Sequence, residues 1–408
     1  MQKTLSFREF LFILPILVII SVFSIWPILD TLKYTVFDYR LNDQQKSQMF
    51  LGERFNTDLF NENAKYVRFY LNKDKALVQD SVQQQEFERI IAYTEEMIAK
   101  YKNQKGVIEL SGNEAKTVQD YIANVKEDTV NLYEANKTAN LVNGENLQMI
   151  IAELDKSFIG SNFIGLQSYR QILTDLRFWI ALKNTLFFTV VSVFIEFVLG
   201  LALAMIMNKA MKGIGLVRTI SLIPWAIPTA VSALMWSYMY DGGSGIIAKL
   251  ASVIGLVESP EHLLLTGVGA MASAIASDVW KTTPYMALLL LGGLQTIDKG
   301  LYESSQIDGA GRIRTFTSIT LPLLKPSILV ALLFRTLDAF RVYDLIAVLT
   351  GGGPGGSTET LSIYAYKVMF GQTNFGYGSV IVLMMFFCVA AIAILFVKVL
   401  GADIMSSK

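Results

Sequence analysis

Long apolar stretches alternate with short polar connections through most of the chain, and one long polar block interrupts them. A transmembrane helix needs about 20 consecutive, mostly apolar residues. Six stretches meet this requirement, at residues 10–28, 179–207, 217–240, 263–294, 328–349 and 380–399. The pattern predicts an all-α, polytopic membrane protein with six transmembrane helices. Because 10–28 lacks a small-x-small cleavage site, we expect an uncleaved span there rather than a signal peptide.

The polar block, residues 41–160, has a different pattern. Its apolar residues recur at helical spacing around 87–101, 118–133 and 147–158, with glycines between these stretches. We expect a bundle of about three helices, with 41–80 irregular or holding a further short element. Two roles stay open for this insert: a passive spacer, or a docking site for an external partner.

Charge separates the same two parts of the chain. The 35 Lys+Arg balance 35 Asp+Glu overall, but the insert holds 14 basic and 19 acidic residues, which leaves 21 and 16 elsewhere. The charged fraction of 17% is below the roughly 25% of soluble proteins, which argues against a cytosolic enzyme. A nucleic-acid binder would show a basic excess, and this chain has none. A single cysteine, Cys388, and a single histidine, His262, predict neither a disulfide framework nor a metal site.

Basic residues also predict the orientation. Lys209 and Arg218 follow the second span, and four more basic residues follow the fourth, whereas loops 241–262 and 350–379 hold only Lys249 and Lys367. Since basic residues concentrate in cytoplasmic loops, both termini should be cytoplasmic and the insert extracytoplasmic. The expected domains are 1–40 (tail and first transmembrane helix), 41–160 (insert) and 161–408 (a five-helix core with a cytoplasmic loop at 294–326).

The loop at 294–326 carries an unusual motif. It contains Glu303-Ser304-Ser305, then Asp308-Gly309-Ala310, then Phe316, Leu321-Pro322 and Pro326. Asp308-Gly309 predicts a turn, and Glu303 suits a position near a helix start. Pro322 and Pro326 are expected to end the element before the next span. The sequence thus predicts a short helix on the cytoplasmic face, of the kind that fills a groove on a partner.

This motif resembles the EAA loop of inner-membrane permease subunits of bacterial ABC importers. The family form is E-A-A-x-x-D-G-A-x5-F-x2-I-x-L-P-x3-P, and here Ser304 and Ser305 replace the two alanines. Other segments are similar to the carbohydrate-type permeases of maltose, trehalose and glycerol-3-phosphate importers. They include Gly165-Leu-Gln-Ser-Tyr169, Pro224-Trp225-Ala-Ile-Pro228 and Thr350-Gly-Gly-Gly-Pro354. The resemblance covers residues 5–40 and 160–405 but not the insert.

The resemblance implies a non-catalytic subunit in the bacterial inner membrane. Two permease subunits would form the path, two ATPase subunits would bind the coupling loops, and an extracytoplasmic substrate-binding protein would deliver the solute. The coupling residues would be Glu303, Ser304, Ser305, Asp308, Gly309, Ala310, Phe316, Leu321 and Pro322. The chain has no G-x4-G-K-[ST] motif, so ATP and Mg would be used by the partner ATPases and no cofactor would be bound here.

The implied substrate is a di- or oligosaccharide or glycoside, with glycerol-3-phosphate or another polyol as the alternative. Two alternative functions of other classes are a secondary transporter and a membrane scaffold. The former should show inverted repeats, and no convincing repeat is visible. A scaffold would have no use for a coupling loop.

Polar residues inside the apolar stretches mark a candidate path. Arg335, Asp338, Arg341 and Asp344 follow one another at intervals of three, so we expect one face of alternating charge. Because an isolated charge at mid-bilayer costs about 3 kcal/mol on insertion scales, these side chains must face protein or water. Arg335 and Asp344 are expected to pair structurally, and Glu196 to pack between helices.

Position matches within the resemblance extend the solute path to seven residues. They are Trp225, Thr229, Lys281, Thr282, Tyr285, Asp338 and Arg341. Aromatic faces can stack on sugar rings while polar groups bind hydroxyls. The alternative for each residue is packing between helices. Pro224 and Pro228 are expected to bend the third span beside this path.

Overall fold

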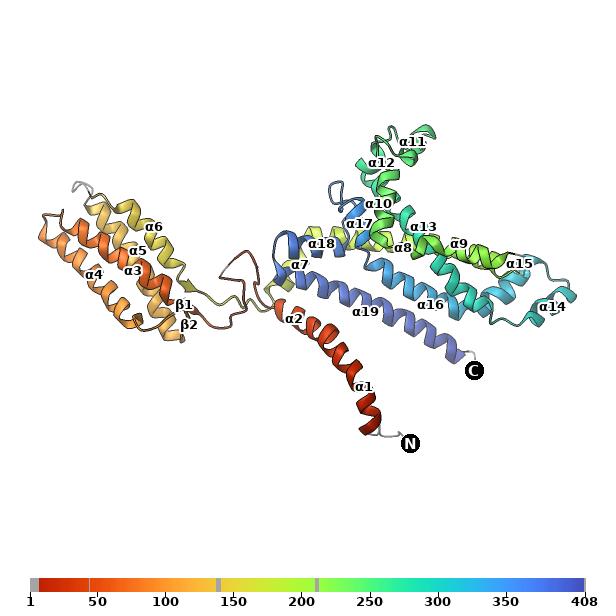
Figure 1. The fold of residues 1–408 in the computed structure, drawn as a ribbon, viewed down its shortest axis with the longest axis horizontal. Coiled ribbons are helices and arrows are strands. Elements are labelled where there is room, and N and C mark those ends of the chain that lie inside the picture. Colours follow the sequence, from red (N-terminus) through yellow and green to blue (C-terminus); the bar gives the residue numbers. More distant parts are fainter. Residues whose placement is uncertain (1–6, 44, 137–140, 210–212, 407–408) are drawn as a thin grey trace. The chain divides into compact units, whose positions relative to one another are not determined.

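The computed structural model describes residues 7–43, 45–136, 141–209 and 213–406. The chain forms two units (Figure 1). Met1–Thr35 and Leu166–Lys408 form one, the core unit, and Val36–Gly165 form the other, the insert unit. The prediction of cytoplasmic termini concerns residues 1–6 and 407–408, which lie outside the described residues.

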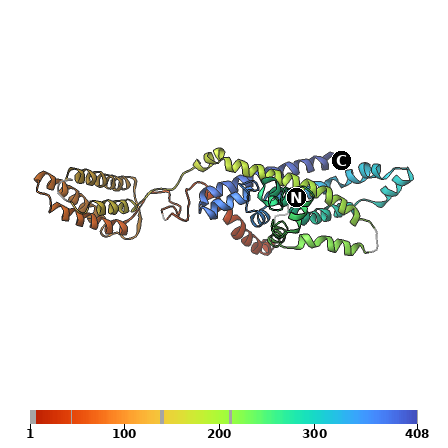
Figure 2. The same cartoon turned by 90° about the horizontal axis from the view of Figure 1, so that it is seen from above.

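The insert unit is mainly helical. Its described helices are α3 (Thr57–Lys75), α4 (Ser81–Tyr101), α5 (Gly112–Ala135) and α6 (Gly144–Asp155), which lie side by side (Figures 1 and 2). Three short antiparallel strands pair in the order β2-β1-β3: β1 (Arg54–Asn56), β2 (Val107–Glu109) and β3 (Phe158–Ile159). Although helices dominate as expected, the unit is not purely α-helical.

Helix α3 contradicts the expectation that residues 41–80 are irregular or hold only a short element. It is 19 residues long and buries Phe60, Ala64, Val67 and Leu71 in the insert core. These residues are spaced by four, three and four, which is a helical period. The local pattern of apolar residues therefore does predict this helix, and the expectation of an irregular segment was wrong.

The core unit consists of helices, three of them with a π-helical turn (η). They are α1 (Phe7–Ile20), η1 (Ser21–Ile25), α2 (Trp26–Tyr34), α7 (Gln167–Thr174), α8 (Leu176–Met207), α9 (Ile214–Ala226), α10 (Thr229–Met239), α11 (Ile246–Val253), α12 (His262–Leu265), α13 (Gly267–Leu294), α14 (Lys299–Ile307), α15 (Arg312–Thr315), η2 (Phe316–Thr320), α16 (Leu321–Phe340), α17 (Asp344–Leu349), α18 (Leu361–Tyr366), η3 (Lys367–Gly371) and α19 (Phe375–Ser406). Residues of α8, α13 and α16 supply much of the buried apolar cluster of this unit.

Among the described residues, four helices are long and apolar enough to cross a membrane. They are Leu11–Tyr34, Leu176–Met207, Arg312–Phe340 and Phe375–Val399. A fifth is counted if α9 and α10 form one bent span. The predicted fourth span corresponds to α13, which has 28 residues but carries Asp278 and Lys281 and is not among these helices.

The third predicted span is bent as expected. Helices α9 and α10 meet at 87°. Ile227, between them, has an extended backbone (φ −70°, ψ 133°), which the following Pro228 favours. The residue pair Ile227-Pro228 therefore ends one helix and starts the next.

The prediction of one helix over 328–349 is wrong. Helix α16 ends at Phe340 and α17 begins at Asp344, so the four charges from Arg335 to Asp344 do not share one continuous face. Pro322 and Pro326 do not end a helix either, because Arg312–Phe340 runs on without a break. Pro322 lies in the first turn of α16, directly after η2, where a missing N–H removes no α-helical hydrogen bond.

Candidate solute cavity and coupling segment

A cavity of about 460 Å³ lies beside the bend between α9 and α10. Its walls come from the bend itself, from α13 and from the end of α16 with the segment that follows. Six of the seven predicted path residues line it: Trp225, Thr229, Lys281, Thr282, Asp338 and Arg341. The seventh, Tyr285, is not in the lining but stacks on Trp225, with ring centroids 5.5 Å apart and planes 8° from parallel.

Lys281 stabilises the bend. Its Nζ donates to the backbone oxygen of Trp225 at 3.3 Å and also to that of Ile227. The last carbonyls of a helix have no partner within the helix, and a cation at this end is favoured by the helix dipole. Lys281 on α13 therefore satisfies the end of α9, and most of its donor capacity is used by the protein.

Arg335 connects three helices beside the cavity. Its Nε and Nη2 donate to the two carboxylate oxygens of Glu196 on α8 at 2.5 and 3.0 Å. Nη2 also donates to Asp278 on α13, and Nη1 donates to Asp338 Oδ2 at 3.0 Å. We call these four residues the Arg335 cluster. Burying the charges without such pairing would be costly, so the cluster holds α8, α13 and α16 together.

Arg335 is a structural pair member, as expected. Its partners are Glu196, Asp278 and Asp338, whereas Asp344 begins α17 and lines the cavity. Glu196 lies between helices, as expected. Sequence spacing showed only the Arg335–Asp338 pair, because the other two partners are far away in the chain. Arg341 caps the end of α16, where its Nε donates to the Leu337 oxygen at 3.1 Å.

The predicted coupling residues form a second feature, which we call the coupling segment (residues 299–322). Helix α14 ends at Ile307, Asp308 caps it, and Gly309 has φ +72°, so the predicted turn is present. Glu303 lies in the second turn of α14 rather than at its start. Glu303, Ser304 and Asp308 are exposed, as are Leu321 and Pro322, while Ala310 is half-buried.

Two coupling residues anchor this segment from inside. Buried Ser305 donates to the Tyr302 oxygen at 2.8 Å and accepts the backbone N–H of Ala310 at 2.9 Å through its own carbonyl. Phe316 packs against the main apolar cluster of the core unit. Ile307 and Ile313 instead expose apolar side chains on either side of the turn. Sequence reasoning did not single out these two isoleucines, although exposed apolar residues beside a turn are typical of contact surfaces.

Residues 196–405 match the family model described as the binding-protein-dependent transport system inner membrane component. The chain belongs to this family. The matched range includes the cavity, the bend and the whole coupling segment. The permease lies in the inner membrane and is a translocation component rather than an enzyme.

Curated relatives and a solved structure agree with this assignment. The trehalose/maltose transport system permease protein MalF of Thermococcus litoralis is 46% identical over 246 residues, which are 60% of this chain and 82% of the relative. The trehalose transport system permease protein SugA of Mycobacterium tuberculosis is 47% identical over 59% of this chain and 76% of its own length. A bacterial alginate ABC transporter, solved with an alginate pentasaccharide-bound periplasmic protein, shares the fold with a TM-score of 0.51. That match is 24% identical and covers 57% of this chain and 82% of the other.

Cavity and coupling segment of the permease are joined by one helix. Arg312–Phe340 is continuous over 29 residues, a length of about 43 Å at 1.5 Å per residue. The coupling segment lies at its start, and Arg335 and Asp338 lie near its end. One continuous helix therefore links the coupling segment to the cavity. Within the described part of the chain, no group of three or more His, Cys, Asp or Glu is arranged to hold a metal ion.

Proposed function

We propose that this permease carries a neutral di- or oligosaccharide or glycoside, delivered by an extracytoplasmic substrate-binding protein. A second permease subunit would complete the path, and two ATPase subunits would use ATP and Mg. The substrates in the names of the relatives, trehalose and maltose, support a sugar. The alginate transporter was solved in complex with a periplasmic protein that holds an alginate pentasaccharide, and this supports a binding-protein partner.

A neutral substrate is supported by one observation: the two buried cations beside the cavity are already bound by groups of the protein. Arg335 is bound by three carboxylates, and Lys281 by two backbone carbonyls. A phosphate would need such cations free for charge-assisted hydrogen bonds. Asp338, in contrast, keeps one carboxylate oxygen outside its pair with Arg335 and exposes two-thirds of its side chain. A hydroxyl-rich neutral solute can donate to this carboxylate while a ring stacks near Trp225.

The second candidate is glycerol-3-phosphate or a similar phosphorylated polyol. Arg341 favours it, since its exposed side chain lines the cavity and only its Nε is used by the Leu337 oxygen. One cation beside Asp338 and Asp344 is a weak basis for phosphate binding, because the two carboxylates repel the same anion.

The proposed orientation follows the basic residues. Six spans, with α13 as the fourth, would put both termini in the cytoplasm and the insert outside. The buried face of α13 carries its polar residues toward α8 and α16, so these charges need not face lipid, where they would be costly. The coupling segment would then face the ATPase subunits, with Ile307 and Ile313 as apolar contacts.

One experiment tests this function. The intact complex would be co-purified with its binding protein and reconstituted, and trehalose, maltose and glycerol-3-phosphate would be screened by thermal shift of the binding protein and by uptake. We expect a disaccharide to stabilise the binding protein and to enter only with ATP. Stabilisation by glycerol-3-phosphate alone would favour the second candidate. Uptake without ATP, or uptake that survives deletion of residues 303–309, would contradict the proposal.

A further inference from the structure

A depression of about 690 Å³ is lined by the start of α8, which follows α7, and by residues on either side of α18. In the core unit, α7 and α18 lie at the end opposite α14 and α15 (Figure 1). Arg177, Glu359 and Lys367 line it together with the backbone of the glycine-rich loop 350–356. We call it the Glu359 crater. It shares no lining residue with the solute cavity, so it is a separate feature of the permease.

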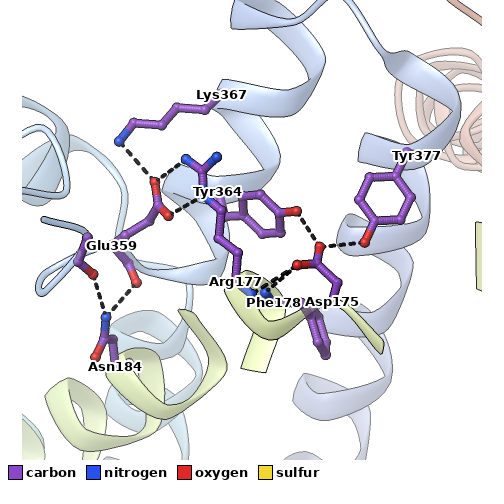
Figure 3. Close-up of polar contacts among 9 residues, drawn as sticks. Asp175, Arg177, Phe178, Asn184, Glu359, Tyr364, Lys367 and Tyr377 are labelled. Atoms are coloured by element: carbon purple, nitrogen blue, oxygen red, sulfur yellow. Dashed lines mark hydrogen bonds and ion pairs between the residues drawn. The ribbon is translucent and has the colours of Figure 1, made fainter. Parts of the chain in front are cut away.

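The crater holds two cations and one carboxylate (Figure 3). Arg177 donates from Nε and Nη2 to Glu359 at 2.7 and 2.8 Å, and Lys367 Nζ donates to Glu359 Oε1 at 2.9 Å. Glu359 exposes 5% of its side chain, whereas Arg177 and Lys367 expose 44% and 41%. The carboxylate is thus the buried anchor, and both cations reach the surface. A guanidinium has five N–H donors and an ammonium three, so donors remain for a second anion.

Ionisation of Glu359 leaves one surplus positive charge in the crater. Burial raises the pKa of Glu359, but its hydrogen bonds from Arg177 and Lys367 outweigh burial and hold the pKa below its usual range. Asp175 lies outside the lining, where its carboxylate accepts hydrogen bonds from the hydroxyl groups of Tyr364 and Tyr377 (Figure 3). It acts on Arg177 from behind, and the crater lining itself holds two cations against one carboxylate.

The glycine loop forms a preorganised floor that is mostly backbone. Thr350 and Thr358 hydroxyls are 2.7 Å apart, and Asn184 Nδ2 donates to the oxygens of Gly356 and Glu359 at 2.9 and 3.1 Å. Four glycines of the loop have φ between +57° and +87°, a region that favours glycine: Gly351, Gly352, Gly355 and Gly356. Gly351, Gly355 and Gly356 have open space where a Cβ would be, so another main chain can approach the floor there, whereas Gly352 is covered by Lys367 and Glu359.

The remaining wall of the crater is apolar. Leu176 and Ile180 line it and are exposed. Both lie in the first turns of the span Leu176–Met207, at the end that carries Arg177, so a protein loop that binds Arg177 can also reach them. A free sugar would leave this apolar wall unused, whereas a protein loop can cover it.

We propose that the Glu359 crater receives an acidic loop of the extracytoplasmic substrate-binding protein. A carboxylate of that loop hydrogen-bonds to Arg177 and Lys367, its main chain lies on the glycine floor, and an apolar neighbour covers Leu176 and Ile180. This inference rests on the proposed function, which places this end of the core unit outside the membrane and supplies the binding protein as partner.

The test uses the assembled permease–ATPase complex in nanodiscs and the binding protein that co-purifies with it. Lys367→Gln keeps the Arg177–Glu359 pair and removes the surplus charge, and Lys367→Glu reverses it. Lys249→Gln, on α11 in the other short loop of the same predicted side, is the matched control. We expect Lys367→Gln to weaken binding about 2- to 5-fold with a weaker salt dependence, and Lys367→Glu about tenfold. Lys249→Gln should bind the binding protein with the affinity of the wild type.

Three results would overturn the inference. If wild type and Lys367→Glu bound the binding protein with equal affinity, the proposed electrostatic contact would not exist. If Lys249→Gln lost as much affinity as Lys367→Gln, the effect would come from the overall charge of this face and not from the crater. A Lys367→Gln complex that loses a subunit, with unchanged binding-protein affinity, would make the crater a subunit interface. Failure of the proposed function is distinguishable, since the wild-type complex would then bind no such protein or import without ATP.

Discussion

Replacing Arg335 by methionine should destabilise the permease more than any other single change in the Arg335 cluster. The side chain is 1% exposed and is the shared partner of Glu196, Asp278 and Asp338. Its loss leaves three carboxylates from three helices close together without a cation. Removing one partner of a buried ion pair costs about 3–5 kcal/mol, because the remaining charge is buried without compensation.

The same geometry predicts an order among the carboxylates. The side chains of Glu196, Asp278 and Asp338 are 0%, 9% and 67% exposed. Glu196→Gln keeps the shape and one acceptor for Arg335, and Asp278 and Asp338 still neutralise the guanidinium, so we expect a loss of about 1–3 kcal/mol. Asp338→Asn should cost no more than about 1 kcal/mol, since its pair is largely solvent-screened. Its effect should appear in uptake instead.

The assay is the thermal-denaturation midpoint of the purified complex in nanodiscs, compared with ATP-driven uptake of the same variants. Arg335→Lys serves as the matched control: it restores the charge, but a single ammonium cannot reproduce the fork that bridges Glu196, Asp278 and Asp338, so we expect partial rescue. A midpoint for Arg335→Met equal to wild type would refute the reasoning. A larger loss of stability in Asp338→Asn than in Glu196→Gln would also refute it, because burial would then not determine the cost of removing a carboxylate.

Three further outcomes are expected. Lys281→Met should lower the thermal midpoint and uptake, at a cost of up to about 3 kcal/mol, because the carbonyls at the α9–α10 bend lose their cationic donor; an unchanged midpoint would deny Lys281 this role. Ile307→Asp should reduce ATPase co-purification at least about tenfold without loss of folding, while Leu265→Asp, another exposed apolar residue, should not. Glu359, whose pKa is lowered from 4.5, contributes stability that is fully present above pH 4.5 and is lost as the pH falls through its lowered folded pKa. Thermal midpoints of Glu359→Gln should therefore lie below wild type at neutral pH and converge with it in acid; parallel curves would contradict this.

Local patterns predicted much of the fold. The bend at Pro228 could be read from the residue before a proline, and the turn at Gly309 from an Asp-Gly pair, since both depend on a few neighbouring φ and ψ angles. Helix α3 was equally local, with a clear period at Phe60, Ala64, Val67 and Leu71. The break between Phe340 and Asp344 had no comparable signal, because neither proline nor glycine marks it.

The amino-acid sequence alone was enough to predict a helical membrane permease with a polar insert, and six of the seven path residues predicted from the resemblance line the cavity. How the charges are used depends instead on the tertiary packing. Arg335 and Glu196 are 139 residues apart, and no spacing rule relates positions on different helices. Pairing of buried charges depends on which helix faces meet, and this is set by the packing of α8, α13 and α16. The same packing distinguishes Asp338, exposed to the cavity, from Glu196, buried behind it.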